Sequence, residues 1–441
     1  MTKQKSEMYV IAVDMGYGHQ RAAYPFTDSG KHGIINANRY QGIPPSEQKM
    51  WESGRKWYEI ISRFKNVPLL GTTAFSIMDH FQKIEPFYPK RDLSEPSNQL
   101  TYYHKKIKSG LGKDLVKELN KKPLPLLSTF FVPAYFAEHH GYKGKIYCVI
   151  CDADVARAWA PYYSNKSKIT YLVPNRRVKA RLQLYGVKEN NILITGFPLP
   201  KENIGGPSQK IVKADMLDRL YHLDPRGAYR KKYAYMIDKY FGSVKNIKKP
   251  KRPLTITFAV GGAGAQRDIG VTLLKRLHKH LKQDKIRLNL VAGVRNDVYL
   301  YFENELKNCG LEGCNNVRII YAEDKTSYFK VFNKILRRTD VLWTKPSELT
   351  FYSALGLPII MAEPIGYQEQ YNRGWLVAIG AGIDSLNPEY VDEWLFDWLD
   401  SGWLAEAAME GFLDAPRMGT YRIENIVLHN KISEIEDTEL L

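Results

Sequence analysis

Short apolar runs alternate along the chain with longer amphipathic segments, and this rhythm constrains the fold more than any other feature. In the second half the runs recur about every 20 to 30 residues, with amphipathic stretches such as 327–338 between them. Strands that alternate with helices are typical of parallel, doubly wound sheets. The pattern predicts an α/β fold with two Rossmann-like domains facing a cleft. The expected strands are 8–13, 124–131, 145–151, 168–173, 191–196, 254–260, 286–292, 317–322, 340–343 and 357–362.

A polar stretch at 201–253 interrupts this rhythm. It contains Gly205-Gly206-Pro207 and ends in the basic run Lys248-Lys249-Pro250-Lys251-Arg252-Pro253. Such compositions are typical of connections between domains. A long helical region with several turns is also expected over about 47–120. The expected domains are 1–200, a connection with a helical arm at 201–253, a second domain at 254–386, and helices at 387–441 that pack back on the domains.

Charge is distributed unevenly over the 441 residues, whose formal net charge is +17. Residues 101–300 carry 39 basic and 14 acidic side chains, whereas residues 351–441 carry 4 basic and 16 acidic ones. This asymmetry indicates a face that attracts nucleic acid, an anionic membrane or a charged substrate, unless it reflects only a generally basic, solvated surface. No apolar run approaches the roughly 18 residues of a membrane-spanning helix. The first apolar run stops at Asp14, which indicates a strand rather than an export signal.

Cys148 and Cys151 have a spacing that could indicate zinc or redox chemistry. They lie in an apolar run that reads as a buried strand, on which residues three apart point to opposite faces. We therefore expect buried free thiols in a reduced, cytosolic protein.

The segment Asp14–Ala23 directly follows the first expected strand. Gly16 and Gly18 permit a tight turn and close approach of a ligand to the backbone. His19 would stand near the helix start, at the sheet edge where open α/β sheets bind ligands, and a neutral imidazole there can act as a general base. A structural turn with a surface histidine fits the spacing equally well.

A second glycine-rich turn, Val260–Gln266, lies between a strand and a helix. Its glycines form a backbone-amide nest suited to a diphosphate. The spacing matches neither the dinucleotide fingerprint nor a P-loop, so neither class is indicated. A purely structural turn is the alternative.

Two further polar clusters follow strands of the second half, and Asp152-Ala-Asp154 follows the strand at 145–151. Ser347 could cap a helix that begins at Glu348. The Glu348 carboxylate could accept hydrogen bonds from the hydroxyls of a ribose. Gln368 and Glu369 could reach sugar hydroxyls, unless these residues form only caps and solvated loops. The Asp-x-Asp motif favours a hydrogen-bonding role over a metal site, because metal binding needs further oxygen ligands.

Together these motifs resemble the GT-B glycosyltransferases of family 28, which include monogalactosyldiacylglycerol synthases, processive diacylglycerol glucosyltransferases and the lipid-II N-acetylglucosaminyltransferase. The similar segments occur in the family's order and span both expected domains. Phe130 stands where the family usually has histidine, and Phe351 where it has glutamate. The segments are GYGHQRAA at 16–23, LLSTFFVPAYFA at 126–137, VICDAD at 149–154, the stretch 171–199, VGGAGA at 260–265, AGVRND at 292–297 and the stretch 335–372.

The resemblance implies a metal-independent, inverting transfer from a UDP-sugar to a lipid or lipid-linked acceptor, with no cofactor. It implies that the first domain binds the acceptor and the second the nucleotide-sugar, on the inner face of the cytoplasmic membrane. His19 and Asp152 are its implied catalytic residues, and Glu348 takes the ribose role. The implied ligand-binding residues are Gly16, Gly18, Gly262, Gly264, Ala265, Arg295, Asn296, Thr344, Lys345, Ser347, Glu348, Gln368 and Glu369.

Three other functions remain open from the sequence. A nucleotide-sugar epimerase uses the same two-domain fold, but no set of acidic groups for proton removal stands out. A basic nucleic-acid-binding protein would exploit the stretch 101–300, yet no recognised binding motif is present, and we expect no nucleic-acid partner. A degenerate transferase would bind the UDP-sugar without turning it over.

Overall fold

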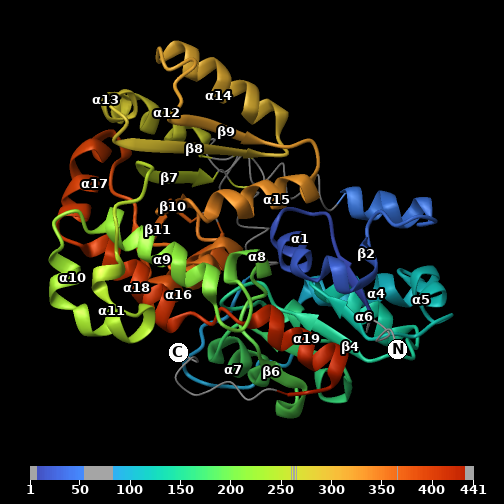
Figure 1. The fold of residues 1–441 in the computed structure, drawn as a ribbon. Coiled ribbons are helices and arrows are strands. Elements are labelled where there is room, and N and C mark those ends of the chain that lie inside the picture. The colour runs from blue at the N-terminus through green and yellow to red at the C-terminus, as the bar shows by residue number, and fades with distance from the viewer. Residues whose placement is uncertain are drawn as a thin grey trace, which may run out of the picture. The chain divides into compact units, whose positions relative to one another are not determined.

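The computed structural model describes residues 7–53, 83–259, 261, 264, 266–364 and 366–432. The chain divides into two compact units, each with its own sheet (Figure 1). Unit 1 comprises Met1–Leu199, Ile365–Tyr371 and Pro416–Leu441, and unit 2 comprises Pro200–Pro364 and Asn372–Ala415.

Unit 1 contains a six-stranded parallel sheet in the order β2-β1-β3-β4-β5-β6. Its central strands β1 (Met8–Ala12), β3 (Leu126–Ser128) and β4 (Ile146–Val149) consist entirely of buried residues. Such strands are apolar without alternation because both faces of the sheet are covered. The others are β2 (Gly30–Asn36), β5 (Thr170–Val173) and β6 (Ile192–Ile194).

The two faces of this sheet bury separate sets of side chains. Tyr9 and Ile11 of β1 join one apolar cluster, and Met8 and Val10 join the other, as expected where successive side chains alternate between faces. The first cluster includes residues of α4 (Asn98–Lys108), α5 (Lys113–Leu119), α6 (Phe131–His139) and α7 (Arg176–Leu184). The second is covered by α19 (Gly419–His429), drawn in red in Figure 1.

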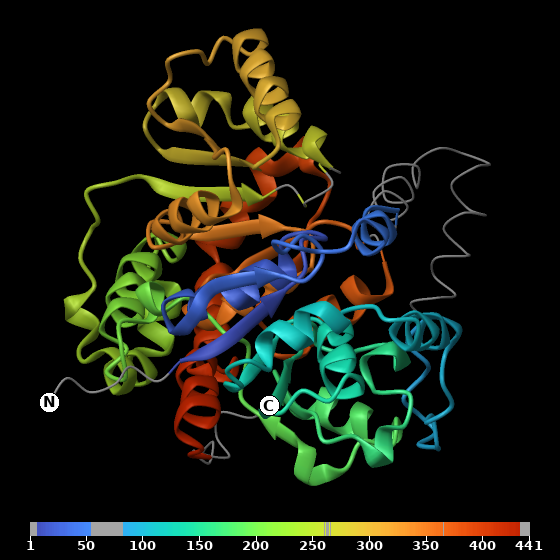
Figure 2. The same cartoon turned by 90° about the vertical axis from the view of Figure 1, so that its right-hand side faces the viewer.

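Unit 2 contains a second six-stranded parallel sheet, in the order β12-β11-β10-β7-β8-β9. Helix α14 (Asn296–Asn308) packs against β8 and β9 (Figures 1 and 2). The predicted α/β class, with two doubly wound parallel sheets, is confirmed. The strands are β7 (Leu254–Ala259), β8 (Ile286–Gly293), β9 (Val317–Tyr321), β10 (Val341–Thr344), β11 (Ile359–Met361) and β12 (Gly382–Asp384). The other helices after β7 are α12 (Arg267–Arg276), α13 (His278–Lys282), α15 (Lys325–Leu336), α16 (Tyr367–Ala378), α17 (Val391–Asp400) and α18 (Trp403–Asp414).

The polar stretch 201–253 is part of unit 2 in the structure. Arg219 of α9 (Lys210–Leu223) is buried, and its guanidinium donates hydrogen bonds to the backbone oxygens of Leu336 (2.9 Å) and Thr339 (2.8 Å). These bonds tie α9 to the end of α15 and the start of β10. The stretch forms α8 (Lys201–Ile204), α9 (Lys210–Leu223), α10 (Ala228–Lys232) and α11 (Ala234–Phe241).

Two strands and one stretch without a helix differ from expectation. β2 and β12 were not predicted, and each lies at an edge of its sheet. The long helical region expected over 47–120 is wrong for 83–97, which contain no helix, and right for α4 and α5. Residues 45–53 are helical, and 54–82 lie outside the described residues.

The expectation of buried free thiols is confirmed for Cys148 and Cys151. Burial raises the pKa of the Cys148 thiol.

Candidate functional site

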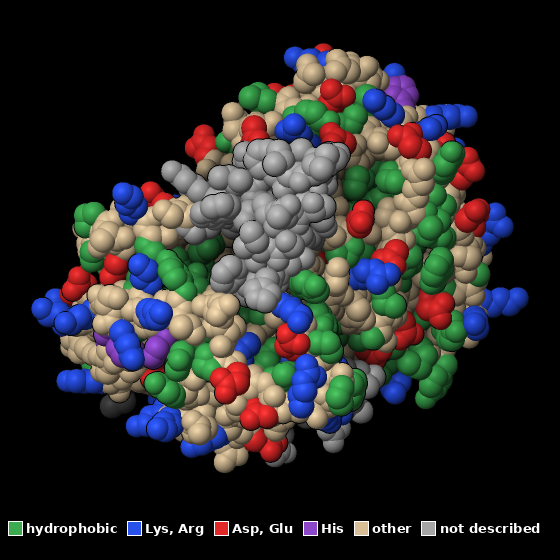
Figure 3. Space-filling model, turned by 180° about the vertical axis from the view of Figure 1, so that it is seen from behind, with side chains coloured by type: hydrophobic (Ala, Val, Ile, Leu, Met, Phe, Trp, Pro, Cys, Tyr) green, Lys and Arg blue, Asp and Glu red, His purple; other side chains and the backbone are tan. Residues whose placement is uncertain are grey.

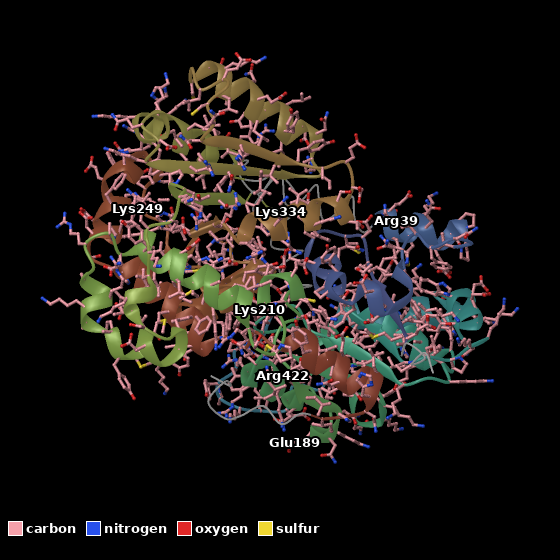
Figure 4. The ribbon with its side chains drawn as sticks, viewed as in Figure 1. Arg39, Glu189, Lys210, Lys249, Lys334 and Arg422 are labelled. Atoms are coloured by element: carbon pink, nitrogen blue, oxygen red, sulfur yellow. The ribbon has the colours of Figure 1, made fainter. Side chains whose placement is uncertain are left out.

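The first candidate loop follows β1 at the carboxyl edge of the unit 1 sheet, and several polar contacts hold it. The Asp14 N–H donates to Asn38 Oδ1 at 2.9 Å, and the Asp14 carboxylate lies 2.8 Å from Arg39, which Figure 4 labels. Gly16 is exposed with φ +141°, a conformation that favours glycine. Helix α1 (Gly18–Ala23) begins immediately afterwards, so the predicted tight turn into a helix is present.

His19 lies in the first turn of α1 and is half-buried. The Thr129 hydroxyl, from the loop after β3, donates to the His19 carbonyl at 2.8 Å. The imidazole packs on two buried rings, with centroid distances of 4.7 Å to Phe130 and 6.0 Å to Trp159. The phenylalanine in place of the family's usual histidine thus forms part of an aromatic wall around His19.

The two carboxylates of Asp152-Ala-Asp154 have different surroundings. Asp154 is buried, and its oxygens accept from Arg181 Nε and Nη2, each at 2.9 Å, and from Arg177 Nε at 3.0 Å. Two guanidinium groups beside one carboxylate disfavour a cation there. Asp152 is half-buried in the loop after β4. Among the described residues, no cluster of three His, Cys, Asp or Glu side chains is arranged to hold a metal.

A cavity of about 500 Å³ opens beside the first loop, with Met15 of that loop in its wall. Its other walls come from the helical residues 45–53 and from α4. The lining combines aromatic and sulfur-containing side chains with two lysines. These residues are Met15, Ser46, Lys49, Met50, Trp51, Ser53, Tyr102, Tyr103 and Lys106.

The second glycine loop follows β7 at the carboxyl edge of the unit 2 sheet. Gly264 has φ +73°, and its N–H donates to the Gly261 carbonyl at 2.8 Å, which closes a tight turn. A Cβ at Gly264 would lie 3.2 Å from Val298 Cγ2 and 3.9 Å from the Arg295 guanidinium, so backbone conformation and space both favour glycine. The predicted ligand-binding residues Gly262 and Ala265 lie outside the described residues.

Two cationic side chains stand over this turn. A Cβ on Gly261 would lie 2.6 Å from Lys345 Cε and 3.5 Å from its Nζ, so Lys345 crosses the glycine backbone closely. Arg295 pairs with Asp297 (2.7 Å), and this hydrogen bond holds the pKa of Asp297 below its usual value. The structure therefore brings Gly264, Arg295 and Lys345 together, and Asn296 starts α14 beside them.

The remaining predicted residues after β10 differ in their surroundings. Thr344 is buried and its hydroxyl donates to the Ala259 carbonyl (3.3 Å), so it links β10 to β7. A helix does begin at Glu348, but it is the 3-10 helix η6 (Glu348–Leu355), and the Ser347 side chain does not cap it, contrary to expectation. Glu348 is half-buried, whereas Phe351 packs in the core on Trp375 at 4.9 Å.

Gln368 and Glu369 lie half-buried in the first turn of α16. They belong to the segment assigned to unit 1, whereas the glycine turn and Lys345 belong to unit 2. Further along α16, the buried Asn372 donates to the Pro346 carbonyl at 3.4 Å. The structure thus links the unit 2 part of α16 to the loop after β10.

Sequence reasoning missed four residues that shape the unit 1 edge: Asn38, Arg39, Thr129 and Trp159. Asn38 and Arg39 follow the unpredicted strand β2, and recognising that strand would have placed them at this edge. Thr129 lies inside a quoted motif, but only the fold reveals its bond to His19. Trp159 contacts His19 from the 3-10 helix η2 (Arg157–Trp159).

Comparisons with known proteins fit this description. A family model described as a domain of unknown function (DUF6938) matches residues 243–385. The processive diacylglycerol beta-glucosyltransferase of Bacillus subtilis is 24% identical over 316 residues, and that of Bacillus licheniformis 22%; each alignment covers 70% of this chain and 68% of the relative.

Solved structures to which the chain shows similarity include Acinetobacter baumannii MurG, at 12% identity with a TM-score of 0.49, covering 96% of this chain and 99% of that one. Another is an S. aureus MnaA–UDP complex, at 12% identity with a TM-score of 0.47, covering 97% of each chain. In the part of the chain that the structure describes, every helix is too short or too polar to span a bilayer. The resemblance to the family 28 group that the motifs indicated is confirmed: in sequence the chain is similar to processive diacylglycerol beta-glucosyltransferases.

Proposed function

We propose that this protein is a glycosyltransferase that moves a sugar from a UDP-sugar to a lipid or lipid-linked acceptor. The observation that carries the proposal is the similarity over 316 residues to two proteins named processive diacylglycerol beta-glucosyltransferase. That alignment is long enough to include residues of both units. The motif residues stand at the carboxyl edges of parallel sheets, where α/β folds bind ligands.

The turn after β7 is the proposed diphosphate site. Gly261 and Gly264 have no Cβ that would block a ligand from the backbone, and Lys345 and Arg295 supply positive charge beside it. Departure of UDP leaves negative charge on the diphosphate, and preorganised amides and cations stabilise such charge as it develops. We propose that Glu348 accepts the ribose hydroxyls, and that Gln368 and Glu369 contact the sugar.

His19 is the proposed general base. Its imidazole takes the proton of the acceptor hydroxyl, whose oxygen forms a bond to the anomeric carbon while the bond from that carbon to the UDP oxygen breaks. Attack opposite the leaving group inverts the configuration and requires no metal. The Thr129 bond holds the His19 backbone, and the rings of Phe130 and Trp159 pack against the imidazole, which favours efficient proton transfer. We propose that Asp152 assists by hydrogen bonding at the same sheet edge.

The cavity beside Met15 is the proposed acceptor site. Its methionine and aromatic side chains suit the apolar part of a lipid acceptor, and Lys49 and Lys106 suit polar or anionic groups near it. A membrane-resident acceptor would place the enzyme at the inner face of the cytoplasmic membrane, as a peripheral protein.

The full-length protein should release UDP from one member of a UDP-sugar panel only when diacylglycerol-containing vesicles are present, with a glycolipid of the expected mass. Vesicles without diacylglycerol are the control. UDP release in their absence with an isomerised sugar would instead identify an epimerase. Failure to form a glycosylated product with any donor and any lipid acceptor would overturn the proposal.

A further inference from the structure

We propose that residues 224–251 of unit 2, here called the basic arm, form a docking surface for an anionic lipid membrane. The arm contains α10 and α11 and the chain that leads from them toward β7. The proposed chemistry neither requires nor explains it. The inference rests on the proposed function only in that a lipid acceptor gives the protein a reason to meet a membrane.

The arm is a fixed part of unit 2, because its apolar side is packed. Tyr229, Ile237 and Phe241 are buried, and the Phe241 ring lies 4.8 Å from Phe412 of α18. The buried Asp224 accepts hydrogen bonds from the N–H groups of Tyr229 (3.1 Å) and Arg230 (2.9 Å), which holds the start of α10.

The opposite side of α11 faces solvent. Tyr235 is 78% exposed, and Lys239, four residues later on the same helical face, is exposed as well. Lys249, which Figure 4 labels, lies at the margin of unit 2 on the side of α10 and α11. The exposed lysines of the arm are Lys231, Lys232, Lys239, Lys245, Lys248, Lys249 and Lys251.

Basic side chains outnumber acidic ones along the arm, and two of the nearby carboxylates have other partners. Asp400 pairs with Arg226, and Asp238 accepts the backbone N–H of Val244. Glu406 of α18 acts electrostatically on Lys232, but no ion pair joins any of the seven lysines to a carboxylate of the described residues.

The kinds of cation indicate a membrane rather than a nucleic acid. Each arginine in or next to the arm pairs with a carboxylate: Arg226 with Asp400, Arg230 with Asp224, and Arg252 with Asp340. Arginine is the usual directional reader of bases and phosphates, whereas lysine acts as a mobile point charge. An exposed tyrosine among lysines suits the headgroup layer, where tyrosine is enriched and anionic lipids attract basic segments. On the face seen in Figure 3, basic and acidic side chains are interspersed rather than gathered into one basic stripe.

The test is cosedimentation of the full chain with vesicles of phosphatidylcholine containing 30 mol% phosphatidylglycerol, and with pure phosphatidylcholine. The arm variant carries K231Q, K232Q and K239Q, and glutamine preserves helix propensity. The matched control carries K279Q, K282Q and K285Q, which remove the same charge from exposed positions in and just after α13 of the same unit. We expect the arm variant to lose affinity for anionic vesicles about fivefold per lysine, and the control to stay within about twofold of wild type.

Equal losses in the two variants would show that only net charge matters and would overturn the proposal. So would wild-type binding by the arm variant, or preference of the wild-type protein for duplex DNA over vesicles of equal charge. UDP release with a short-chain, water-soluble diacylglycerol separates the two hypotheses. If vesicle binding depends on the arm lysines but no turnover is seen, the docking surface is supported and the proposed function is not.

Discussion

The carboxyl edges of the two sheets differ in the groups that form them. In unit 1 the edge is held by side chains: Asn38 and Arg39 hold the loop at Asp14, and Thr129 and two rings hold His19. In unit 2, Lys345 and Arg295 lie close to the backbone of Gly261 and Gly264 at this edge.

This contrast matches two chemical tasks. A base needs one side chain held in one orientation, and rings packed against it limit its movement. A diphosphate needs several amides and mobile positive charge, which glycines and long cationic side chains supply. Variants should therefore affect catalysis at the first edge and donor affinity at the second.

The largest effect should follow from His19→Ala. Removing the proposed base should lower kcat by about 100- to 10,000-fold while leaving the dissociation constant for UDP near wild type. Steady-state kinetics and titration calorimetry measure the two quantities. His32→Ala is the matched control, because His32 is an exposed histidine of β2 in the same unit. Full turnover by His19→Ala would show that His19 is not the base and that the unit 1 edge does not have the catalytic role assigned to it.

Asp154→Ala should give the next largest effect, on stability. It leaves the buried guanidinium of Arg181 without its carboxylate, and breaking a buried pair from one side costs about 3 to 5 kcal/mol. Urea unfolding measures this loss, and Asp152→Ala, at a half-buried position, should cost far less. If Asp152→Ala were the more destabilising change, the two aspartates would have the opposite roles.

The sequence predicts the buried strands better than the edge strands. β7 is a run of six buried residues and stands out at once, whereas β2 (GKHGIIN) has two glycines and a half-exposed, non-alternating pattern. An edge strand has one neighbour and less covered surface, so its composition is less constrained. Missing β2 also hid Asn38 and Arg39, which follow it.

The site residues also differ in how well the sequence alone predicts them. Local turn chemistry was enough to place Gly16, Gly18, Gly264 and His19, because a tight strand-to-helix turn is encoded within a few residues. The pairing of Asp154 with Arg181, 27 residues later, depends on how α7 packs and has no local signal. The distance between Lys345 and Gly261 likewise depends on the pairing of β10 with β7.

Lys345→Ala tests the second edge and should weaken UDP binding by about tenfold or more, the usual scale for losing a charge-assisted contact. Lys345→Arg should retain part of the affinity. Lys334→Ala is the control, because Lys334, labelled in Figure 4, is an exposed lysine of α15 in the same unit. Unchanged UDP affinity with a reduced kcat would mean that Lys345 acts in catalysis rather than in donor binding, contrary to the proposed difference between the edges.

The smallest expected effect on UDP binding concerns Asp340, a buried carboxylate at the opposite, amino end of β10. It pairs with Arg252 (2.8 Å between Nη2 and Oδ1), and His222 Nδ1 lies 3.0 Å away. Burial alone would raise its pKa, but the hydrogen bonds from His222 and Arg252 hold the pKa of Asp340 below its usual value.

A carboxyl group whose pKa is lowered by folding stabilises the protein above its unfolded pKa of about 3.9, and that contribution disappears as the pH falls through the lower folded value. The stability difference between wild type and Asp340→Asn should therefore be largest near pH 7 and shrink below about pH 4, as urea midpoints across this range would show. UDP affinity at pH 7 should not change, because Asp340 lies at the end of the strand away from the glycine turn. A stability difference independent of pH would mean that Asp340 acts through packing rather than charge. A loss of UDP affinity would mean that the two ends of the unit 2 sheet are not independent.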